Sequence, residues 1–380
     1  MEWVAFIILL CYILALGAIL VLTNEGVIIE LRPLEESPLH SISVVIAYRN
    51  EKDTLPTLLA DLEAQLETTA VLSIILVDDH STDESYALCQ AFAHRSSLPI
   101  ALVQNRGEAG KKAALRQGIA LATSDYILTT DADCRLPNTW FGTVAELVGS
   151  SSPDLGILSL VLAPALGFFE QMQQQEFATI MAATAAMAKA GHPSMANGAN
   201  LVFRRKLFMA YEASRLGQEV ASGDDIFLLH FAKQAKAHII YSDALALQTR
   251  TKPEATIMGF AKQRLRWAGK WTSYADLGTV VTAIGVWLIH LVYTYTCIAL
   301  IAGNIHPVFL FMVLAKGILE YRIISKTLAK SSLSPKLLPF LALQVCYSPY
   351  VVLTGLLSNI PSLYIWKGRR PNKYQKERRR

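Results

Sequence analysis

Residues 125–133 read DYILTTDAD, a strand-like run that ends in two carboxylates, Asp131 and Asp133, one residue apart. Tyr, Ile and Thr are common in strands, so this segment predicts a strand that stops at an acidic pair. Like charges so close repel one another and raise each other's pKa. A solvated turn is one explanation, because Asp is a frequent turn residue. A site for a hard cation is the other, because carboxylate oxygens suit Mg²⁺ and Mn²⁺.

Two more segments follow the same pattern, an apolar strand-like run with a polar end. They are SISVVIAY at 41–48 and SIILVDD at 73–79, each followed by a polar turn and a helix-like stretch. Strands that alternate with helices predict a mostly parallel α/β sheet. Ligands of such sheets bind at the carboxyl ends of the strands. Because YRNE (48–51), DDHSTD (78–83) and the acidic pair all fall at strand ends, the cation site is favoured over the turn.

Two short motifs outside these strands carry charges suited to the same chemistry. GEAGKKAAL (107–115) places Lys111 and Lys112 after a glycine-containing turn, where they would bind phosphate oxygens or simply begin a solvated helix. SGDDIFLLHFAK (222–233) places Asp224 and Asp225 before an apolar helical stretch. They would either favour the helix N-terminus or supply a general base, which must reach the proton it removes.

The composition indicates a membrane protein. Of the 380 residues, 52% are hydrophobic and only 17% are charged, which is too apolar for an ordinary soluble enzyme. The five cysteines form no CxxC pair, so the sequence predicts neither a zinc site nor a disulfide framework. Val4–Leu22 has no charge and is long enough to span a bilayer, and the acidic Glu2 in front of it argues against a cleaved signal peptide. Further apolar segments occupy 279–302, 308–324 and 337–365.

The distribution of basic residues predicts the topology. The loop at 326–336 holds three lysines and the GNIHP loop at 303–307 holds no Lys or Arg, which places the first loop inside and the second outside. Residues 41–278 then lie in the cytoplasm. The tail after Trp366 carries eight Lys or Arg residues, which favour anionic lipid over nucleic acid. A full span at 337–365 would put this tail outside, so we expect a re-entrant or interfacial hairpin that bends near YSPY (347–350).

A mixed segment separates the sheet region from the membrane segments. Residues 253–278 combine Lys, Arg and Trp with apolar residues, a pattern typical of an amphipathic helix at a membrane surface. Within it, QRLRW (263–267) places Gln263, Arg266 and Trp267 on nearly one helical face. This face is suited to meet a diphosphate and to stack on a sugar or an acceptor.

The motifs VVIAYRNE, VDDHSTD, TTDADC, GDD and QRLRW, in this order, resemble the family 2 glycosyltransferases. The membrane members, such as the cellulose, chitin and hyaluronan synthases and ceramide glucosyltransferase, are the most similar. The resemblance covers about residues 41–275. It implies an α/β GT-A (Rossmann-like) domain, a nucleotide-diphosphate sugar donor, a divalent cation (Mg²⁺ or Mn²⁺) and inversion at the anomeric carbon.

The resemblance also implies a role for individual residues. The nucleoside would be held by Tyr48, Glu51 and Asp78 or Asp79, and the metal and diphosphate by Asp131 and Asp133. The base would be Asp225, although Gly-Asp-Asp replaces the Glu-Asp of many relatives and leaves Asp224 as the alternative. The residues that would close over the donor are Gln263, Arg266 and Trp267, and the acceptor-side loop would be NGANLVFRR (197–205).

Together these observations predict five segments. They are a membrane anchor at 1–24, a cytoplasmic GT-A catalytic domain at 41–252, an interfacial helix region at 253–278, membrane segments at 279–366 and a basic cytoplasmic tail at 367–380. The predicted function is transfer from a nucleotide-diphosphate sugar, with UDP expected, to a membrane lipid acceptor at the inner (plasma) membrane. The alternatives are a processive polysaccharide synthase, disfavoured by the small membrane part, and an inactive sugar-binding or scaffold protein of the same fold.

Overall fold

The computed structural model describes residues 2–23, 40–65, 71–218, 220 and 223–360. They belong to two compact units. The unit that we call the sheet unit comprises 26–163 and 195–252, and the unit that we call the helical unit comprises 1–25, 164–194 and 253–380.

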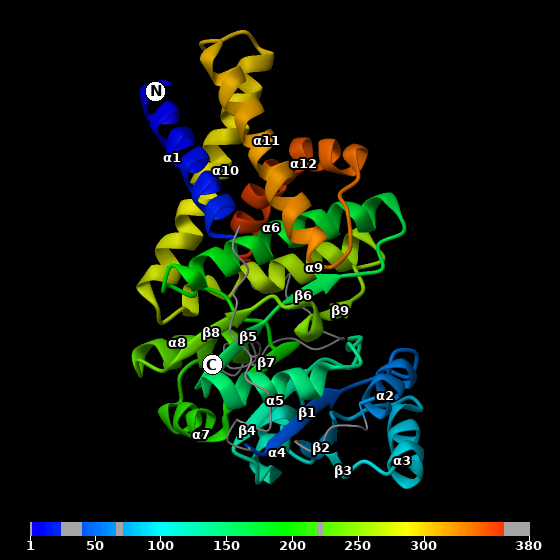
Figure 1. Ribbon diagram of the computed structural model, residues 1–380. Coiled ribbons are helices and arrows are strands. Elements are labelled where there is room, and N and C mark those ends of the chain that lie inside the picture. Colours follow the sequence, from blue (N-terminus) through cyan, green and yellow to red (C-terminus); the bar gives the residue numbers. More distant parts are fainter. Residues whose placement is uncertain (1, 24–39, 66–70, 219, 221–222, 361–380) are drawn as a thin grey trace, which may run out of the picture. The chain divides into compact units, whose positions relative to one another are not determined.

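The sheet unit is built on a seven-stranded sheet in the order β3-β2-β1-β4-β7-β5-β8 (Figure 1). β1 to β4 are parallel to one another, β7 runs antiparallel to both of its neighbours, and β5 and β8 are parallel. A second, two-stranded parallel sheet pairs β6 with β9. The strands are β1 (Ile42–Tyr48), β2 (Val71–Asp78), β3 (Ile100–Gln104), β4 (Tyr126–Thr130), β5 (Leu155–Leu158), β6 (Leu160–Leu162), β7 (Asn200–Arg204), β8 (Ile239–Ser242) and β9 (Thr249–Thr251). The mostly parallel α/β sheet predicted from the alternating pattern is confirmed.

Helices cover this sheet because its central strands are apolar on both faces. Every residue of β1 is buried, and its side chains share a core with Trp140 and Phe141 of α5. On α4, a Cβ at Gly118 would lie 2.6 Å from a methyl group of Val45 and 2.8 Å from one of Val77, so the glycine permits a close approach of helix and sheet. The helices are α2 (Leu55–Glu63), α3 (Ser85–Arg95), α4 (Lys111–Leu121), α5 (Trp140–Ser151), α7 (Arg205–Ser214), α8 (Asp224–Gln234) and the 3-10 turn η2 (Leu245–Leu247).

The helical unit contains long helices and the shorter helix α9. Its elements are α1 (Glu2–Leu22), α6 (Phe168–Lys189), α9 (Ile257–Ala268), the 3-10 turn η3 (Trp271–Ser273), α10 (Leu277–Ile301), α11 (Val308–Ala329) and α12 (Leu337–Leu357). Leu9 of α1 packs with Tyr293 of α10 and Phe309 of α11 in one apolar cluster. Among the described helices, α1, α10 and α12 are long and apolar enough to cross a membrane.

α11 carries a buried polar pair. Lys316 donates to Glu320 across 2.7 Å, one helical turn away. Gln344 of α12 and Tyr12 of α1 also bond to this pair, at 2.8–2.9 Å. The network therefore joins three helices through groups whose hydrogen bonds are satisfied within the protein, as polar groups at membrane depth require.

The structure differs from two expectations about how the chain is organised. The hairpin expected near residues 347–350 is wrong, because α12 runs through them as one helix with Pro349 inside it. Proline removes only one backbone donor, and hydrogen bonds from Tyr350 to Glu176 and between Ser348 and His290 hold this stretch. Residues 164–194, which the predicted catalytic domain included, belong to the helical unit. The basic tail at 367–380 lies outside the described residues.

Candidate functional site

The acidic motifs follow three neighbouring strands of the sheet. β2, β1 and β4 are adjacent and parallel, and Tyr48 pairs in register with Asp78 at the ends of β1 and β2. Asp131 comes directly after the last residue of β4. Since parallel strands end at the same edge of a sheet, the loops after β1, β2 and β4 share one edge, which is where α/β sheets bind ligands.

Three acidic side chains follow β4 and β1. Asp131 and Asp133 come after β4, and Glu51 comes after β1. Loss of hydration, followed by the negative charges of Asp131 and Glu51, raises the pKa of Asp133 to about 6. Asp133 is thus destabilised in its charged form, and a nearby cation would favour that form. Glu51 itself accepts a 2.9 Å hydrogen bond from the hydroxyl of Thr54.

The ammonium group of Lys111 is a positive charge within this acidic cluster. It is the first residue of α4, which begins after Gly110, and its ammonium group contacts the carboxylate of Asp131. Burial lowers the pKa of Lys111, but the charges of Asp131, Asp225 and Asp133 outweigh burial and raise it. Lys111 is therefore charged and lies among three of the acidic side chains singled out from the sequence.

The acidic pair after β2 anchors loops of the same edge. Asp79 is 1% exposed, and its Oδ1 accepts hydrogen bonds from Asn105 at 3.0 Å and from the backbone of Gly110 at 2.9 Å. This holds the start of α4 and hence the position of Lys111. Asp78 is also buried and accepts from the backbone of Ser81 at 3.3 Å. Asp79 therefore has a structural role, in addition to any ligand that Asp78 and Asp79 bind.

Tyr48 lies deeper than the sequence suggested. Its ring is 2% exposed and belongs to the core cluster of the sheet unit, beside Cys89. Burial first, and then the neighbouring Cys89, raise the pKa of its hydroxyl above the ordinary value. Alternation along a strand is not visible when every residue of the strand is buried, so the sequence pattern did not distinguish a core tyrosine from a ligand-facing one.

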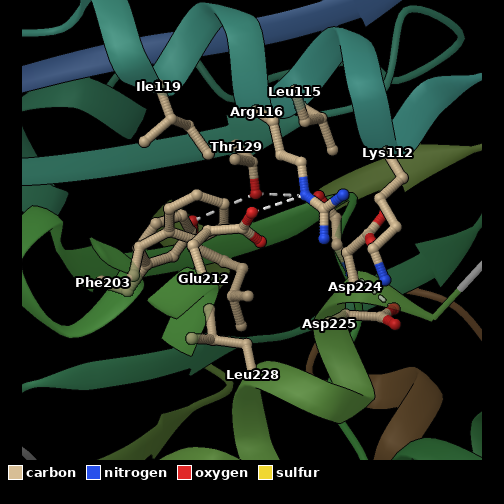
Figure 2. A pocket seen from close by; sticks show the side chains of 13 residues that line it. Lys112, Leu115, Arg116, Ile119, Thr129, Phe203, Glu212, Asp224, Asp225 and Leu228 are labelled. Atoms are coloured by element: carbon tan, nitrogen blue, oxygen red, sulfur yellow. Dashed lines mark hydrogen bonds and ion pairs between the residues drawn. The ribbon is translucent and has the colours of Figure 1, made fainter. Parts of the chain in front are cut away.

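Asp224 and Asp225 begin α8, and the two carboxylates have different partners. Asp225 Oδ2 accepts a 3.0 Å hydrogen bond from the backbone of Gly198, so the NGAN loop contacts this residue directly. Asp224 pairs with Lys112 (Figure 2), and its Oδ1 lies 3.4 Å from the ammonium group. Burial raises the pKa of Asp224, and Lys112 opposes the rise.

Lys112 and Lys111 are adjacent in sequence but lie in different surroundings. Lys112 is 7% exposed and donates a 2.8 Å hydrogen bond to the carbonyl of Gly217, besides its pairing with Asp224. It therefore ties α4 to the segment before α8 instead of joining the acidic cluster after β4. A small pocket there is lined by Lys112, Asp224 and Asp225 together with apolar side chains such as Leu115 and Phe203 (Figure 2).

The QRLRW residues belong to α9 in the helical unit. Gln263 donates a 3.0 Å hydrogen bond to Glu254, and the ring of Trp267 lies 6.3 Å from that of Phe177 on α6. Arg266 is partly buried. Thr256 caps the helix by accepting a hydrogen bond from the backbone of Gly259.

Sequence reasoning missed two ion pairs that hold these motifs in place. Arg135 follows the acidic pair and makes two hydrogen bonds, of 2.7 and 2.9 Å, to Asp61 of α2. Arg264, inside QRLRW, makes a buried two-pronged pair with Glu176 of α6. The only sequence signal was a basic residue inside or beside each motif, and nothing local identified its distant partner.

Comparison with known proteins finds a family model that matches part of the chain. The model of glycosyl transferase family 2 matches residues 43–211. The chain carries a glycosyl transferase family 2 domain. The matched range includes the acidic cluster after β4, Lys111 and Lys112, whereas Asp224, Asp225 and α9 lie beyond it.

Two transferases from Pseudomonas are similar to about a quarter of this chain. An undecaprenyl-phosphate 4-deoxy-4-formamido-L-arabinose transferase from Pseudomonas aeruginosa is 41% identical over 102 residues, which are 26% of this chain and 30% of that protein. A protein of the same name from Pseudomonas fluorescens is 37% identical over 101 residues, with the same two coverages. The matched segment thus spans less than a third of these relatives.

A solved structure is similar over almost the whole chain. It is a mannosyltransferase from Pyrobaculum calidifontis in complex with GDP-Man and Mn²⁺, with a TM-score of 0.52 and 16% identity, covering 94% of this chain and 96% of that one. At this identity the likeness concerns the fold alone. The predicted α/β, Rossmann-like GT-A architecture with apolar helices at both ends of the chain is confirmed.

Proposed function

We propose that this protein is a membrane-associated inverting glycosyltransferase that moves a sugar from a nucleotide-diphosphate donor, with UDP expected, to a lipid acceptor. The observation that carries the proposal is the cluster at the carboxyl edge of the sheet. There the ammonium group of Lys111 contacts Asp131 and lies near Asp133 and Asp225, and Glu51 lies near Asp133. A site with this balance of charges is suited to bind a cation together with a diphosphate.

The residues present fit a divalent cation. Asp131 and Asp133 offer carboxylate oxygens, the ligands that Mg²⁺ and Mn²⁺ prefer, and Lys111 already occupies the place of a cation beside them. Among the described residues, no group of three or more His, Cys, Asp or Glu side chains is arranged to hold a metal ion by itself. Two protein carboxylates with the remaining positions left to phosphate oxygens and water is the usual arrangement for Mg²⁺. When bound, the metal would withdraw charge from the departing diphosphate.

Other side chains would position the donor and accept the proton. Asp79, by holding Gly110 and Asn105, fixes the loop from which Lys111 reaches the phosphates. Asp225, held by the backbone of Gly198, would accept the proton of an acceptor hydroxyl. Asp224 is engaged by Lys112, which favours Asp225 as the base. Gln263, Arg266 and Trp267 would close over the donor, a role that the resemblance implies.

Two observations support a lipid acceptor. The Pseudomonas relatives are named as transferases that act on undecaprenyl phosphate, a lipid. In the part of the chain that the structure describes, three helices are long and apolar enough to cross a bilayer, so a lipid acceptor would share their environment. From the distribution of basic residues we place the family 2 domain on the cytoplasmic side of the inner (plasma) membrane.

A donor screen tests the proposal. Full-length protein in detergent would be offered a panel of nucleotide sugars with Mg²⁺ or Mn²⁺, and nucleotide release would be followed with and without polyprenyl phosphate or a lipid bearing a hydroxyl. We expect release from one donor that depends on a lipid and yields one added sugar per acceptor. A ladder of long polymer would instead favour the polysaccharide synthase, and binding of a donor without turnover would favour the inactive sugar-binding protein.

A further inference from the structure

Arg264 lies within QRLRW but points away from Arg266, one of the residues expected to bind the donor. Arg264 is 4% exposed, whereas Gln263 and Arg266 in the same motif are only partly buried. Since successive residues of a helix are about 100° apart, Arg264 and Arg266 point to roughly opposite sides of α9. Arg264 is therefore directed into the helical unit.

The guanidinium group of Arg264 is held there by hydrogen bonds and aromatic contacts. Its Nε and Nη2 donate to the two carboxylate oxygens of Glu176 on α6, at 3.1 and 2.6 Å. The hydroxyl of Tyr350 on α12 donates to the same carboxylate at 2.6 Å. The rings of Phe260 and Trp267 lie 4.4 Å from the guanidinium carbon. Three helices thus meet at one buried ion pair, and one of its aromatic contacts is a predicted donor residue.

Gln263 is held by the same guanidinium. Arg264 Nη1 donates to the amide oxygen of Gln263, and the amide nitrogen of Gln263 donates to Glu254 at 3.0 Å. Glu254 is in turn fixed by two backbone hydrogen bonds of 2.9 Å with the side chain of Gln173 on α6. Both ends of the Gln263 amide therefore have partners, which sets its orientation.

We infer that Arg264, held by Glu176 and Tyr350, is a positioning residue that sets the orientation of Gln263 and Trp267. The inference rests on the proposed donor-binding role of these two side chains. A buried ion pair is a weak source of stability, because taking both charges out of water costs about as much as their attraction returns. Apolar side chains would pack α6, α9 and α12 at least as well. The charged pair provides directed contacts to both predicted donor residues at once.

The first test reads the position of Trp267 directly. The full chain in detergent would be labelled with 5-fluorotryptophan, and the ¹⁹F resonance of Trp267 would be assigned with Trp267→Phe. We expect this resonance to shift or broaden in Arg264→Lys, which keeps the charge but loses the planar fork. Tyr350→Phe, which removes one hydroxyl and is the variant to rely on if Arg264→Lys does not fold, should move it less. Tyr321→Phe, whose ring packs on Phe340 of α12, is the matched control and should leave it unchanged.

The second test asks whether Arg264 acts through Gln263. Donor KM and kcat would be measured for Arg264→Lys, for Gln263→Ala and for the double variant. We expect the KM of Arg264→Lys to rise roughly 10- to 100-fold, the range for partners that orient a functional side chain, with a smaller change in kcat. In the double variant, Arg264→Lys should add little to the loss caused by Gln263→Ala.

The possible failures are distinguishable. A Trp267 resonance that moves in neither Arg264→Lys nor Tyr350→Phe, or losses that multiply independently in the double variant, overturns the inference. A resonance that moves while no nucleotide sugar is turned over by the unmodified protein sinks the proposed function and leaves the positioning contact standing.

Discussion

The ammonium group of Lys111 contacts the carboxylate of Asp131, so one internal cation already neutralises part of the acidic cluster that follows β4. A divalent cation at Asp131 and Asp133 would have to share or replace this contact. We therefore expect Lys111→Met to bind Mn²⁺ alone about tenfold more tightly, because a competing positive charge is removed from the site. The nucleotide–Mn²⁺ complex should bind more weakly to the same variant, because the phosphates lose an ammonium partner.

Electron paramagnetic resonance of free Mn²⁺ measures the first affinity, and calorimetry with the nucleotide measures the second. Lys206→Met on α7 is the control, since Lys206 is exposed and the substitution changes the net charge equally. Mn²⁺ affinities that change alike in the two variants would assign the effect to overall charge and not to the Lys111 contact.

Metal removal should stop the reaction. Because Asp131 and Asp133 are the carboxylates placed to bridge a cation to the diphosphate, EDTA should abolish nucleotide release and added Mg²⁺ or Mn²⁺ should restore it. Asp131→Asn and Asp133→Asn should each weaken donor binding, by losing a negative ligand while keeping the side-chain shape. Full turnover in EDTA would contradict the assignment of a metal to this pair.

Sequence reasoning located the edge of the sheet because the signal there is local. In β1, β2 and β4, an apolar strand-forming run and the polar residues at its end are consecutive in the chain, and parallel pairing then brings the three ends together. The same reasoning predicted the apolar helices, whose length and composition are also local properties. It predicted a hairpin at residues 347–350 from Pro349 and charge, although the contacts of α12 sustain a continuous helix.

Contacts between distant segments were beyond the sequence pattern. Glu176 is 88 residues from Arg264, and Gly217 is 105 residues from Lys112. The chain offers many acidic residues and carbonyl groups of equal chemistry, and only the packing of helices selects one of them. For the same reason Lys111 and Lys112 looked alike in the sequence, although one contacts the acidic cluster and the other holds α4 to the segment before α8.

The close approach of α4 to the sheet predicts a stability effect. Gly118→Ala would place a Cβ 2.6 Å from Val45 and 2.8 Å from Val77, both in the core of the sheet unit. Overpacking of this kind typically costs about 1–3 kcal/mol in the free energy of unfolding. Thermal unfolding in detergent should show a lowered midpoint for this variant, while Gly107→Ala, whose Cβ would meet its nearest atom at 3.5 Å, should differ little from the unmodified protein. Equal midpoints for both variants would mean that α4 moves away from the sheet at little cost.

A reporter fusion can test on which side of the membrane Arg380 lies. α12 contacts α6 both at its start, where Gln175 bonds to the carbonyl of Lys336 at 3.3 Å, and further on at Tyr350. Both contacts are made by neighbouring residues of α6, Gln175 and Glu176. The eight basic residues after Trp366 favour the cytoplasmic side of the membrane, which requires that α12 does not cross the bilayer. A reporter fused after Arg380 should therefore be active only as a cytoplasmic fusion. An extracytoplasmic result would mean that α12 crosses the bilayer.

The two acidic motifs should differ in the step that they affect. Asp225 accepts a hydrogen bond from Gly198 and is not engaged by Lys112, so it remains the side chain placed to take a proton from the acceptor. Asp225→Asn should keep donor affinity near that of the unmodified protein, because the substitution preserves shape and leaves Asp131 and Asp133 intact. Transfer to a hydroxyl acceptor should fall roughly 10²- to 10⁴-fold, the usual contribution of a general base.

Calorimetry with the nucleotide sugar and a turnover assay on the same preparations would separate binding from transfer, and Asp224→Asn is the matched control. A comparable loss of turnover in Asp224→Asn would move the base by one residue, and a loss of donor affinity in Asp225→Asn as large as that in Asp133→Asn would end the division of roles. The acceptor can be varied in the same assay. A phosphate monoester is largely ionised near neutral pH, since its second pKa is about 6, and needs no base. If Asp225→Asn keeps its turnover with polyprenyl phosphate and loses it with a hydroxyl-bearing lipid, the carboxylate acts as a base toward hydroxyl acceptors; if neither transfer falls, Asp225 is not the base.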